Sequence, residues 1–155
     1  MNHHIGILLT VLALAGAASA QNWFGVRSGY PLGVTLHYGV GNALANGADL
    51  RVSARVVVGS GGSAAFGIGV DALVDVYAEG PVSAYVGGGP SLEAGAGRVD
   101  LDVHGLLGAA FRFTDLGLSP LSVFVEANIG AAVSLSGGSA RIPTFGAAVG
   151  FNWDF

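Results

Sequence analysis

The sequence predicts an all-β chain that forms an eight-stranded antiparallel up-and-down transmembrane β-barrel. Hydrophobic residues make up 52% of the 155 residues and the mean hydropathy is +0.63, whereas charged residues make up only 10%, against about 25% in a typical soluble domain. Apolar and polar residues also alternate along eight successive segments, which is typical of strands with one apolar face. A barrel with lipid outside and polar groups inside combines both observations, because apolar side chains then recur at every second position.

A short apolar segment at the N-terminus predicts a secretory signal peptide. Residues 5–17 are rich in Leu and Ala, and Ala18-Ser19-Ala20 has the small-x-small pattern that signal peptidase accepts. The preceding residues contain no Lys or Arg, and a retained membrane anchor is the alternative. We expect cleavage, because the apolar stretch is short for a membrane-spanning helix. The chain is therefore predicted to consist of a cleaved signal peptide at 1–20 and a barrel at 21–155.

Eight segments with a period of two follow in order along the rest of the chain. They cover residues 22–30, 33–41, 48–58, 64–76, 82–93, 99–113, 121–135 and 144–155. One apolar residue of each segment, in chain order, marks the face expected to meet lipid: Val26, Val34, Val52, Val70, Val86, Leu101, Val125 and Val149. The segments are roughly 9–15 residues long, which suits tilted strands that cross a bilayer. Stretches rich in Gly, Pro, Asn or Ser separate the segments and predict turns.

A water-soluble barrel or sandwich is the alternative fold. In that fold the polar faces would meet water, yet they are dominated by Gly, Ser and Thr, and the chain contains no Lys. Such faces suit an enclosed interior better than a solvated surface. The lack of Cys excludes disulfides and Cys-ligated metals. A net charge of −4 gives no reason to expect a nucleic acid as a partner.

The last segment carries alternating aromatic residues at the end of the chain. Phe151, Trp153 and Phe155 share one face of the terminal sequence AAVGFNWDF, which resembles the C-terminal assembly signal of bacterial outer-membrane proteins. Together with the signal peptide and the eight segments, the chain resembles the small OmpA/OmpX-like class of barrels. The resemblance implies a bacterial outer-membrane location, contact with outer-membrane lipid and with the barrel-assembly machinery during insertion, and chain ends on the periplasmic side. The outward turns are shorter than in that class, which argues against an adhesin-like or receptor-like role.

Aromatic residues gather near the periplasmic ends of the segments, where an aromatic girdle at the lipid–water interface is expected. The residues concerned are Trp23, Phe24, Phe111, Phe113, Phe151, Trp153 and Phe155.

Charged residues on the polar faces are expected to fill the interior. Counting from the periplasmic ends places one group near mid-height: Arg27, His37, Arg55, Asp71 and Glu126. A second group, which includes Arg51 and Asp75, is placed nearer the periplasmic end. Charges away from bulk water persist when they are paired, and the interior of an eight-stranded barrel is only wide enough for side chains. We therefore expect ion pairs that plug the lumen, although the many inward glycines leave a narrow water-filled channel as an alternative.

Motifs for catalysis, cofactor binding or metal binding are not found in the sequence. Asp100 and Asp102 share a strand face and could hold a cation, but a solvated acidic rim is the favoured interpretation. His37 and His104 lie on distant segments and match no metal motif. The spacing of His104 from Ser91 or Ser134 does not indicate a catalytic triad.

The predicted function is a non-enzymatic outer-membrane barrel with a structural or envelope-assembly role. The alternatives are a narrow channel for water or small ions and, less favoured, an outer-membrane enzyme that modifies lipid.

Overall fold

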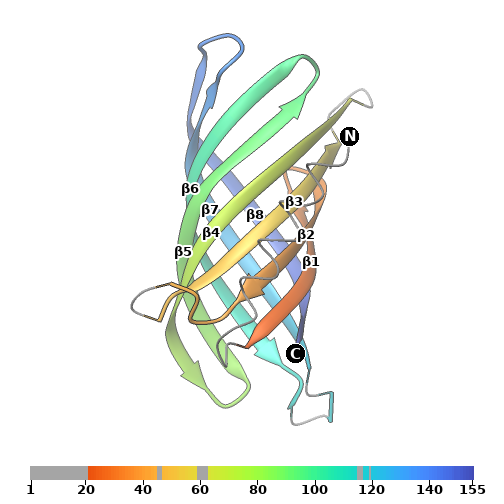
Figure 1. Cartoon of the computed structure of the whole chain (residues 1–155), viewed down its shortest axis with the longest axis vertical. Helices are drawn as coiled ribbons and strands as arrows, with labels where there is room; N and C mark the ends of the chain where they lie inside the picture. The colour runs from red at the N-terminus through yellow and green to blue at the C-terminus, as the bar shows by residue number, and fades with distance from the viewer. Residues whose placement is uncertain (1–20, 45–46, 59–62, 115–116, 119) are drawn as a thin grey trace.

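The computed structural model describes residues 21–155 apart from 45–46, 59–62, 115–116 and 119. Eight strands form one closed antiparallel barrel, in which each strand pairs with its neighbours in the sequence and β1 pairs with β8 (Figure 1). The strands are β1 (Asn22–Tyr30), β2 (Gly33–Val40), β3 (Asp49–Val58), β4 (Ala64–Glu79), β5 (Val82–Gly95), β6 (Arg98–Arg112), β7 (Leu121–Ser134) and β8 (Ala140–Asp154). The predicted eight-stranded up-and-down barrel is confirmed. The predicted signal peptide lies outside the described residues.

The predicted segments and the strands differ mainly at their ends. β4 continues to Glu79 and β5 to Gly95, beyond the predicted ends at 76 and 93. Both extensions lead into two-residue hairpin turns, where Gly80 has a φ of 57° and Gly97 a φ of 75°. Such turns match the twist of the paired strands, so the strands remain paired right up to the turn.

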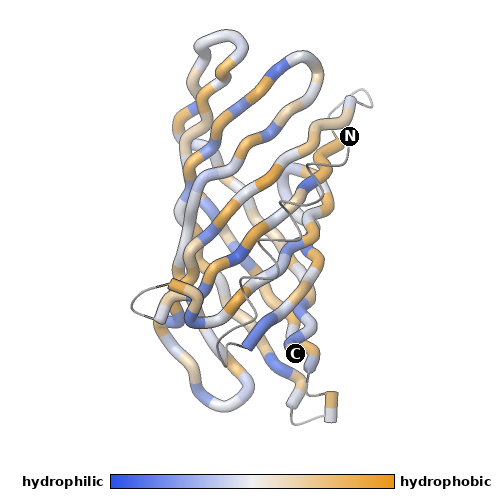
Figure 2. Tube along the Cα trace, viewed as in Figure 1, coloured by the Kyte–Doolittle hydropathy of each residue, from blue (hydrophilic) through white to orange (hydrophobic). Residues whose placement is uncertain are grey.

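The two faces of the sheet differ as the alternation predicts. Val70 and Val125 point outward and are 42% and 56% exposed, whereas their neighbours Asp71 and Glu126 are 1% and 5% exposed in the lumen. Figure 2 shows hydrophobic and hydrophilic residues alternating along the strands. Within the described part of the chain, no helix has the length and apolar character needed to cross a membrane.

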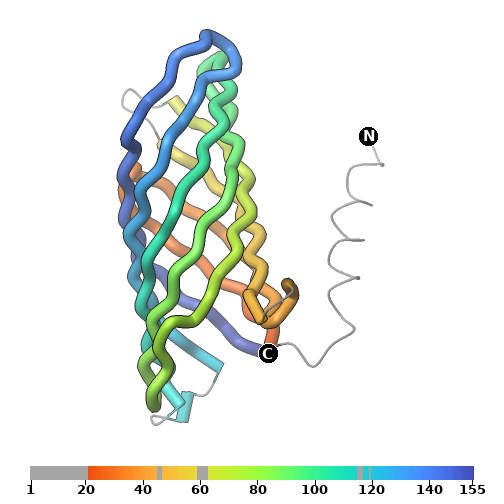
Figure 3. Tube along the Cα trace, turned by 90° about the vertical axis from the view of Figure 1, so that its left-hand side faces the viewer, coloured from red at the N-terminus to blue at the C-terminus, as the bar shows by residue number. Residues whose placement is uncertain are grey.

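The two ends of the barrel are unlike. Backbone hydrogen bonds in both directions join Asn22 to Phe155, and the β4–β5 turn lies at this same end, which we call the terminal end. The other end, which we call the hairpin end, carries the β1–β2, β5–β6 and β7–β8 turns. β1 to β3 have 8–10 residues and β4 to β8 have 14–16. The β5–β6 and β7–β8 hairpins therefore extend past β1 and β2 at the hairpin end (Figures 1 and 3).

One aromatic residue of the expected girdle faces the lumen instead. Trp23 lies opposite Gly39 in the β1–β2 register, and its ring occupies the lumen beside that glycine. Phe24, the next residue, is 53% exposed on the outer face. The expectation for Trp23 is wrong because adjacent strand residues point to opposite faces. Phe151, Trp153 and Phe155 at the terminal end are at least half exposed, and Phe111 is 39% exposed.

Candidate functional site

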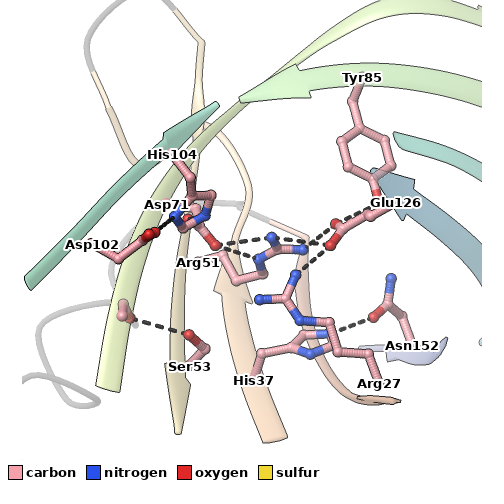
Figure 4. Close-up of polar contacts among 11 residues, drawn as sticks. Arg27, His37, Arg51, Ser53, Asp71, Tyr85, Asp102, His104, Glu126 and Asn152 are labelled. Atoms are coloured by element: carbon pink, nitrogen blue, oxygen red, sulfur yellow. Dashed lines mark hydrogen bonds and ion pairs between the residues drawn. The ribbon is translucent and has the colours of Figure 1, made fainter. Parts of the chain in front are cut away.

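A cluster of four charged side chains occupies the lumen. Arg51 lies at its centre with a side chain that is only 2% exposed, and its Nη2 is 2.9 Å from Asp71 Oδ2. On the other side of the guanidinium, Nη1 donates to Glu126 Oε1 at 2.5 Å. Arg27 Nη1 donates to the second oxygen of Glu126, Oε2. We call Arg27, Arg51, Asp71 and Glu126 the plug (Figure 4).

The strand register explains why these four residues meet. Arg51 on β3 and Asp71 on β4 are directly opposite in the ladder and both point inward. Glu126 projects from β7, four strands away from Arg51 around the closed barrel, and Arg27 projects from β1; both contacts of Glu126 bring these side chains together. Two guanidinium groups and two carboxylates balance in charge, and the planar fork of Arg51 can contact both carboxylates at once.

Neighbouring polar side chains extend the plug in two directions. Tyr85 donates its hydroxyl to Glu126 Oε1 at 2.8 Å. His104 Nε2 lies 3.1 Å from Asp71 Oδ1, and its Nδ1 lies 3.1 Å from Asp102 Oδ1. Both ring nitrogens of His104 therefore face carboxylates.

His37 lies close to the plug but makes no ion pair in it. Its Nε2 is 2.7 Å from Asn152 Oδ1, and its ring meets the Phe124 ring edge-on at a centroid distance of 5.6 Å. Burial of His37 and Phe124, which are 4% and 2% exposed, makes this pair part of the packed interior.

Arg55 is the member of the expected cluster that the structure places elsewhere. Its Nη2 donates to the Pro31 carbonyl at 2.8 Å near the hairpin end, and Arg51 takes the position in the plug that the sequence had suggested for Arg55. The prediction that Arg55 lies near mid-height was wrong because it rested on counting residues along each strand. Strand tilt shifts the level at which residues of neighbouring strands meet. The opposite charges of Arg51 and Asp71 across one hairpin were the signal that could have identified the pair.

The plug separates two polar cavities in the lumen. The cavity toward the hairpin end, the hairpin vestibule, has a volume of about 310 Å³. Its polar lining includes Arg27, Thr35, Arg55, Glu93, Asp102 and His104. The cavity toward the terminal end, the terminal vestibule, has a volume of about 370 Å³. Its lining includes Trp23, Arg51, Asp75, Tyr85, Arg112 and Asp154.

Several inward glycines provide room for rings rather than for water. A Cβ at Gly39 would lie 2.0 Å from the Trp23 ring, and one at Gly108 would lie 2.2 Å from Tyr85 Cζ. Aromatic rings occupy the space beside these two glycines, so neither adds free volume to the lumen.

The two aspartates of the expected acidic rim have separate partners. Asp100 accepts from Arg98 and Arg141 at 3.3 and 2.8 Å, and Asp102 contacts His104 and Thr144. Within the described residues, no group of three or more His, Cys, Asp or Glu side chains could hold a metal ion.

The barrel resembles known structures at low sequence identity. The N-terminal β-barrel domain of Pseudomonas aeruginosa OprF matches with a TM-score of 0.56 and 12% identity, over 88% of this chain and 96% of that one. The chain has the fold of a small outer-membrane β-barrel. Neisserial surface protein A has a TM-score of 0.45 at 16% identity, and the outer membrane enzyme PagL a TM-score of 0.47 at 11%. Each of these two matches covers 88% of this chain, together with 94% of Neisserial surface protein A and 99% of PagL. No family model and no curated protein matches the sequence.

Proposed function

We propose that this protein is a non-enzymatic integral barrel of the bacterial outer membrane whose lumen is closed, and that it has a structural or envelope-assembly role. The plug is the observation on which this proposal rests. Arg51, Asp71 and Glu126 are 1–5% exposed and joined by charge-assisted hydrogen bonds. Such contacts are roughly twice as strong as neutral ones, which favours a permanently closed lumen.

Exposed apolar side chains around the barrel support residence in a lipid bilayer. Residues more than half exposed on the outer face include Val34, Leu36, Ile68, Leu107, Ile129 and Val149. A contiguous apolar surface of this kind is unfavourable in water and favourable against lipid. In the proposed orientation, the terminal end faces the periplasm.

The proposed partners are outer-membrane lipid and, during insertion, the barrel-assembly machinery. Phe151 and Trp153 point outward on β8, and Phe155 directly follows the strand, next to the seam where β1 and β8 close the barrel. A terminal strand with this pattern is accessible before closure, which suits recognition during assembly.

Single-channel recording tests the closed lumen. The refolded wild type is expected to show no steady conductance in planar bilayers, and Arg51→Ala is expected to raise conductance because it removes the side chain that links Asp71 to Glu126. Arg55→Ala is the matched control, since Arg55 lies outside the plug, and it should behave as the wild type. Steady conductance of the wild type would overturn the closed barrel.

A narrow channel for water or small ions is the second candidate. The observation that favours it is the pair of vestibules on either side of the plug, because rearrangement of this one cluster could connect them. Conductance of the wild type that appears and disappears in discrete steps would support this candidate.

The arrangement around His104 argues against a lipid-modifying enzyme. A serine nucleophile needs a ring nitrogen as its base, and both nitrogens of His104 face Asp71 and Asp102. Within the described chain, neither Ser91 nor Ser134 makes a hydrogen bond to His104. We therefore propose that the barrel has no catalytic role.

A further inference from the structure

The hairpin vestibule has walls of opposite charge that the plug does not fully use. On one wall, Arg27, Thr35 and Arg55 follow one another in register across β1, β2 and β3. On the other wall, Glu93 projects from β5 and Asp102 from β6, and both line the same cavity. Asp100 and Arg141 also line the cavity, but they pair with each other.

Two of these charged groups have no ionic partner among the described residues. Arg55 makes its side-chain hydrogen bond to a backbone carbonyl, that of Pro31. Glu93 takes part in none of the ion pairs found within the described ranges. Arg55 and Glu93 lie two strands apart, on either side of β4. A ligand could therefore bind both groups without breaking an existing ion pair.

Glycines of β4 leave the space between the two walls open. Gly67 lies opposite Arg55 on one side and Glu93 on the other, and Gly69 lies between Ser53 and Ser91. Unlike Gly39 and Gly108, neither carries an aromatic ring over it, and both line the cavity. A Cβ at Gly67 would come no closer than 3.2 Å to a neighbour, the Leu92 carbonyl oxygen. Without a side chain at Gly67, the cavity stays open between Arg55 and Glu93.

We propose that the hairpin vestibule binds a small zwitterion with its ammonium and carboxylate at opposite ends, as in a dipeptide. The carboxylate would accept from Arg55, whose planar guanidinium group suits two-point contact with a carboxylate. The ammonium would donate to Glu93. A simple anion would leave Glu93 without a partner, and a simple cation would leave Arg55 without one, whereas a zwitterion pairs with both.

The size and shape of the cavity agree with this ligand class. Its volume of about 310 Å³ is at the lower end of the range for small-molecule sites. An eight-stranded barrel is narrow enough for one small ligand to touch opposite walls. Because the plug forms the floor of the vestibule, the ligand would enter and leave at the hairpin end. Binding at these walls does not depend on whether the plug ever opens, so it can fail or succeed independently of the closed lumen proposed above.

The test is titration of the refolded barrel in a nonionic detergent with L-alanyl-L-alanine, followed by calorimetry and by amide chemical shifts. Saturable binding is expected, with the largest shifts at Gly67, Gly69 and their neighbours. N-acetyl-alanyl-alanine lacks the ammonium, and alanyl-alanine amide lacks the carboxylate. Each should bind at least about tenfold more weakly, because each loses hydrogen bonds between charged groups.

Substitutions in the two vestibules provide matched variants and controls. Arg55→Gln and Glu93→Gln should each weaken binding of the dipeptide at least about tenfold, and Gly67→Leu should abolish it by filling the gap. Arg112→Gln and Asp154→Asn neutralise an arginine and a carboxylate in the terminal vestibule and should leave the affinity unchanged. The proposal is overturned if the wild type shows no saturable binding, if the capped dipeptides bind equally well, or if the control variants weaken binding as much as the vestibule variants.

Discussion

At the plug, one arginine connects two carboxylates that come from different parts of the barrel wall. Arg51 contacts Asp71 from the neighbouring strand and Glu126 from β7. All three side chains have about 2% or less of their surface exposed. Buried charges are expensive to desolvate, so they persist where each finds a partner of opposite sign. The stability of the interior therefore depends more on Arg51 than on any other basic residue in the lumen.

Arg51→Met should lower the free energy of unfolding by about 3–5 kcal/mol, because it leaves Asp71 and Glu126 without their shared partner at a buried site. The measurement is urea-induced unfolding of the refolded barrel in lipid vesicles. Arg55→Met serves as the control, and its effect should stay below about 1 kcal/mol since the side chain lies at the rim and bonds only to a backbone carbonyl. Equal losses for both variants would contradict the assignment of Arg51 as the central residue.

A second test at the residue scale concerns the glycine beneath Tyr85. Gly108→Ala would place a Cβ about 2 Å from the Tyr85 ring, which forces the ring away from Glu126 and should cost about 1–3 kcal/mol through overpacking. Gly137→Ala is the matched control, because a Cβ there would meet no atom within 4 Å. The measurement is the unfolding midpoint of each variant. A wild-type midpoint for Gly108→Ala would show that the position of the Tyr85 ring is not constrained.

The inward and outward faces of β8 make different contacts. Its inward residues include Asn152, which holds His37, and its outward residues include Phe151 and Trp153. It also closes the barrel by pairing with β1 from Trp23 to Tyr30. A change on the outward face can therefore affect lipid contact and assembly without disturbing the interior contacts.

Replacing both Trp153 and Phe155 with Ser should reduce the amount of folded barrel in the outer membrane, because the terminal strand then loses the aromatic pattern that resembles an assembly signal. Fractionation of cells and the heat-modifiable gel shift of the folded form provide the measurement. Phe145→Ser is the control, since Phe145 is also outward on β8 and 62% exposed, but lies toward the hairpin end. Normal insertion of the double variant would argue against a role for the terminal residues.

For the molecule as a whole, the proposed lipid bilayer would take the place that a hydrophobic core has in a soluble protein. In the described chain, far fewer large hydrophobic side chains are buried than exposed, and many of the buried side chains are polar. The fold therefore has its apolar side chains outside, as the proposed contact with lipid requires, and its polar side chains inside, where they pair with one another.

The stability cost of a charge on the outer face should therefore depend strongly on its depth in the bilayer. Val125→Lys, beside the plug residue Glu126 but pointing outward, should cost about 2–4 kcal/mol of stability in a bilayer. Leu32→Lys, in the β1–β2 turn and 68% exposed, should cost about 0–1 kcal/mol, because a lysine near the interface can reach water. Folding titrations in vesicles measure both, and equal costs would show that Val125 does not face the hydrocarbon.

The sequence by itself determined the number of strands, their order and, for most residues, the face of the sheet to which the side chain points. These properties are local, because strict alternation over eight segments specifies the facing of every residue relative to its neighbour, as for Val70 and Asp71. Trp23 shows the limit of grouping residues by height alone, since its facing contradicts its position in the expected girdle.

Only the tertiary structure decided which inward charges meet and where the lumen remains open. The level of Arg51 relative to Asp71 and Glu126 depends on the register between strands and on their tilt around the barrel, which are properties of the closed sheet and not of any one strand. For the same reason, the structure alone distinguishes glycines such as Gly39, covered by an aromatic ring, from Gly67, which borders a cavity. The Trp23 ring from the neighbouring strand fills the space over Gly39, whereas no ring covers Gly67.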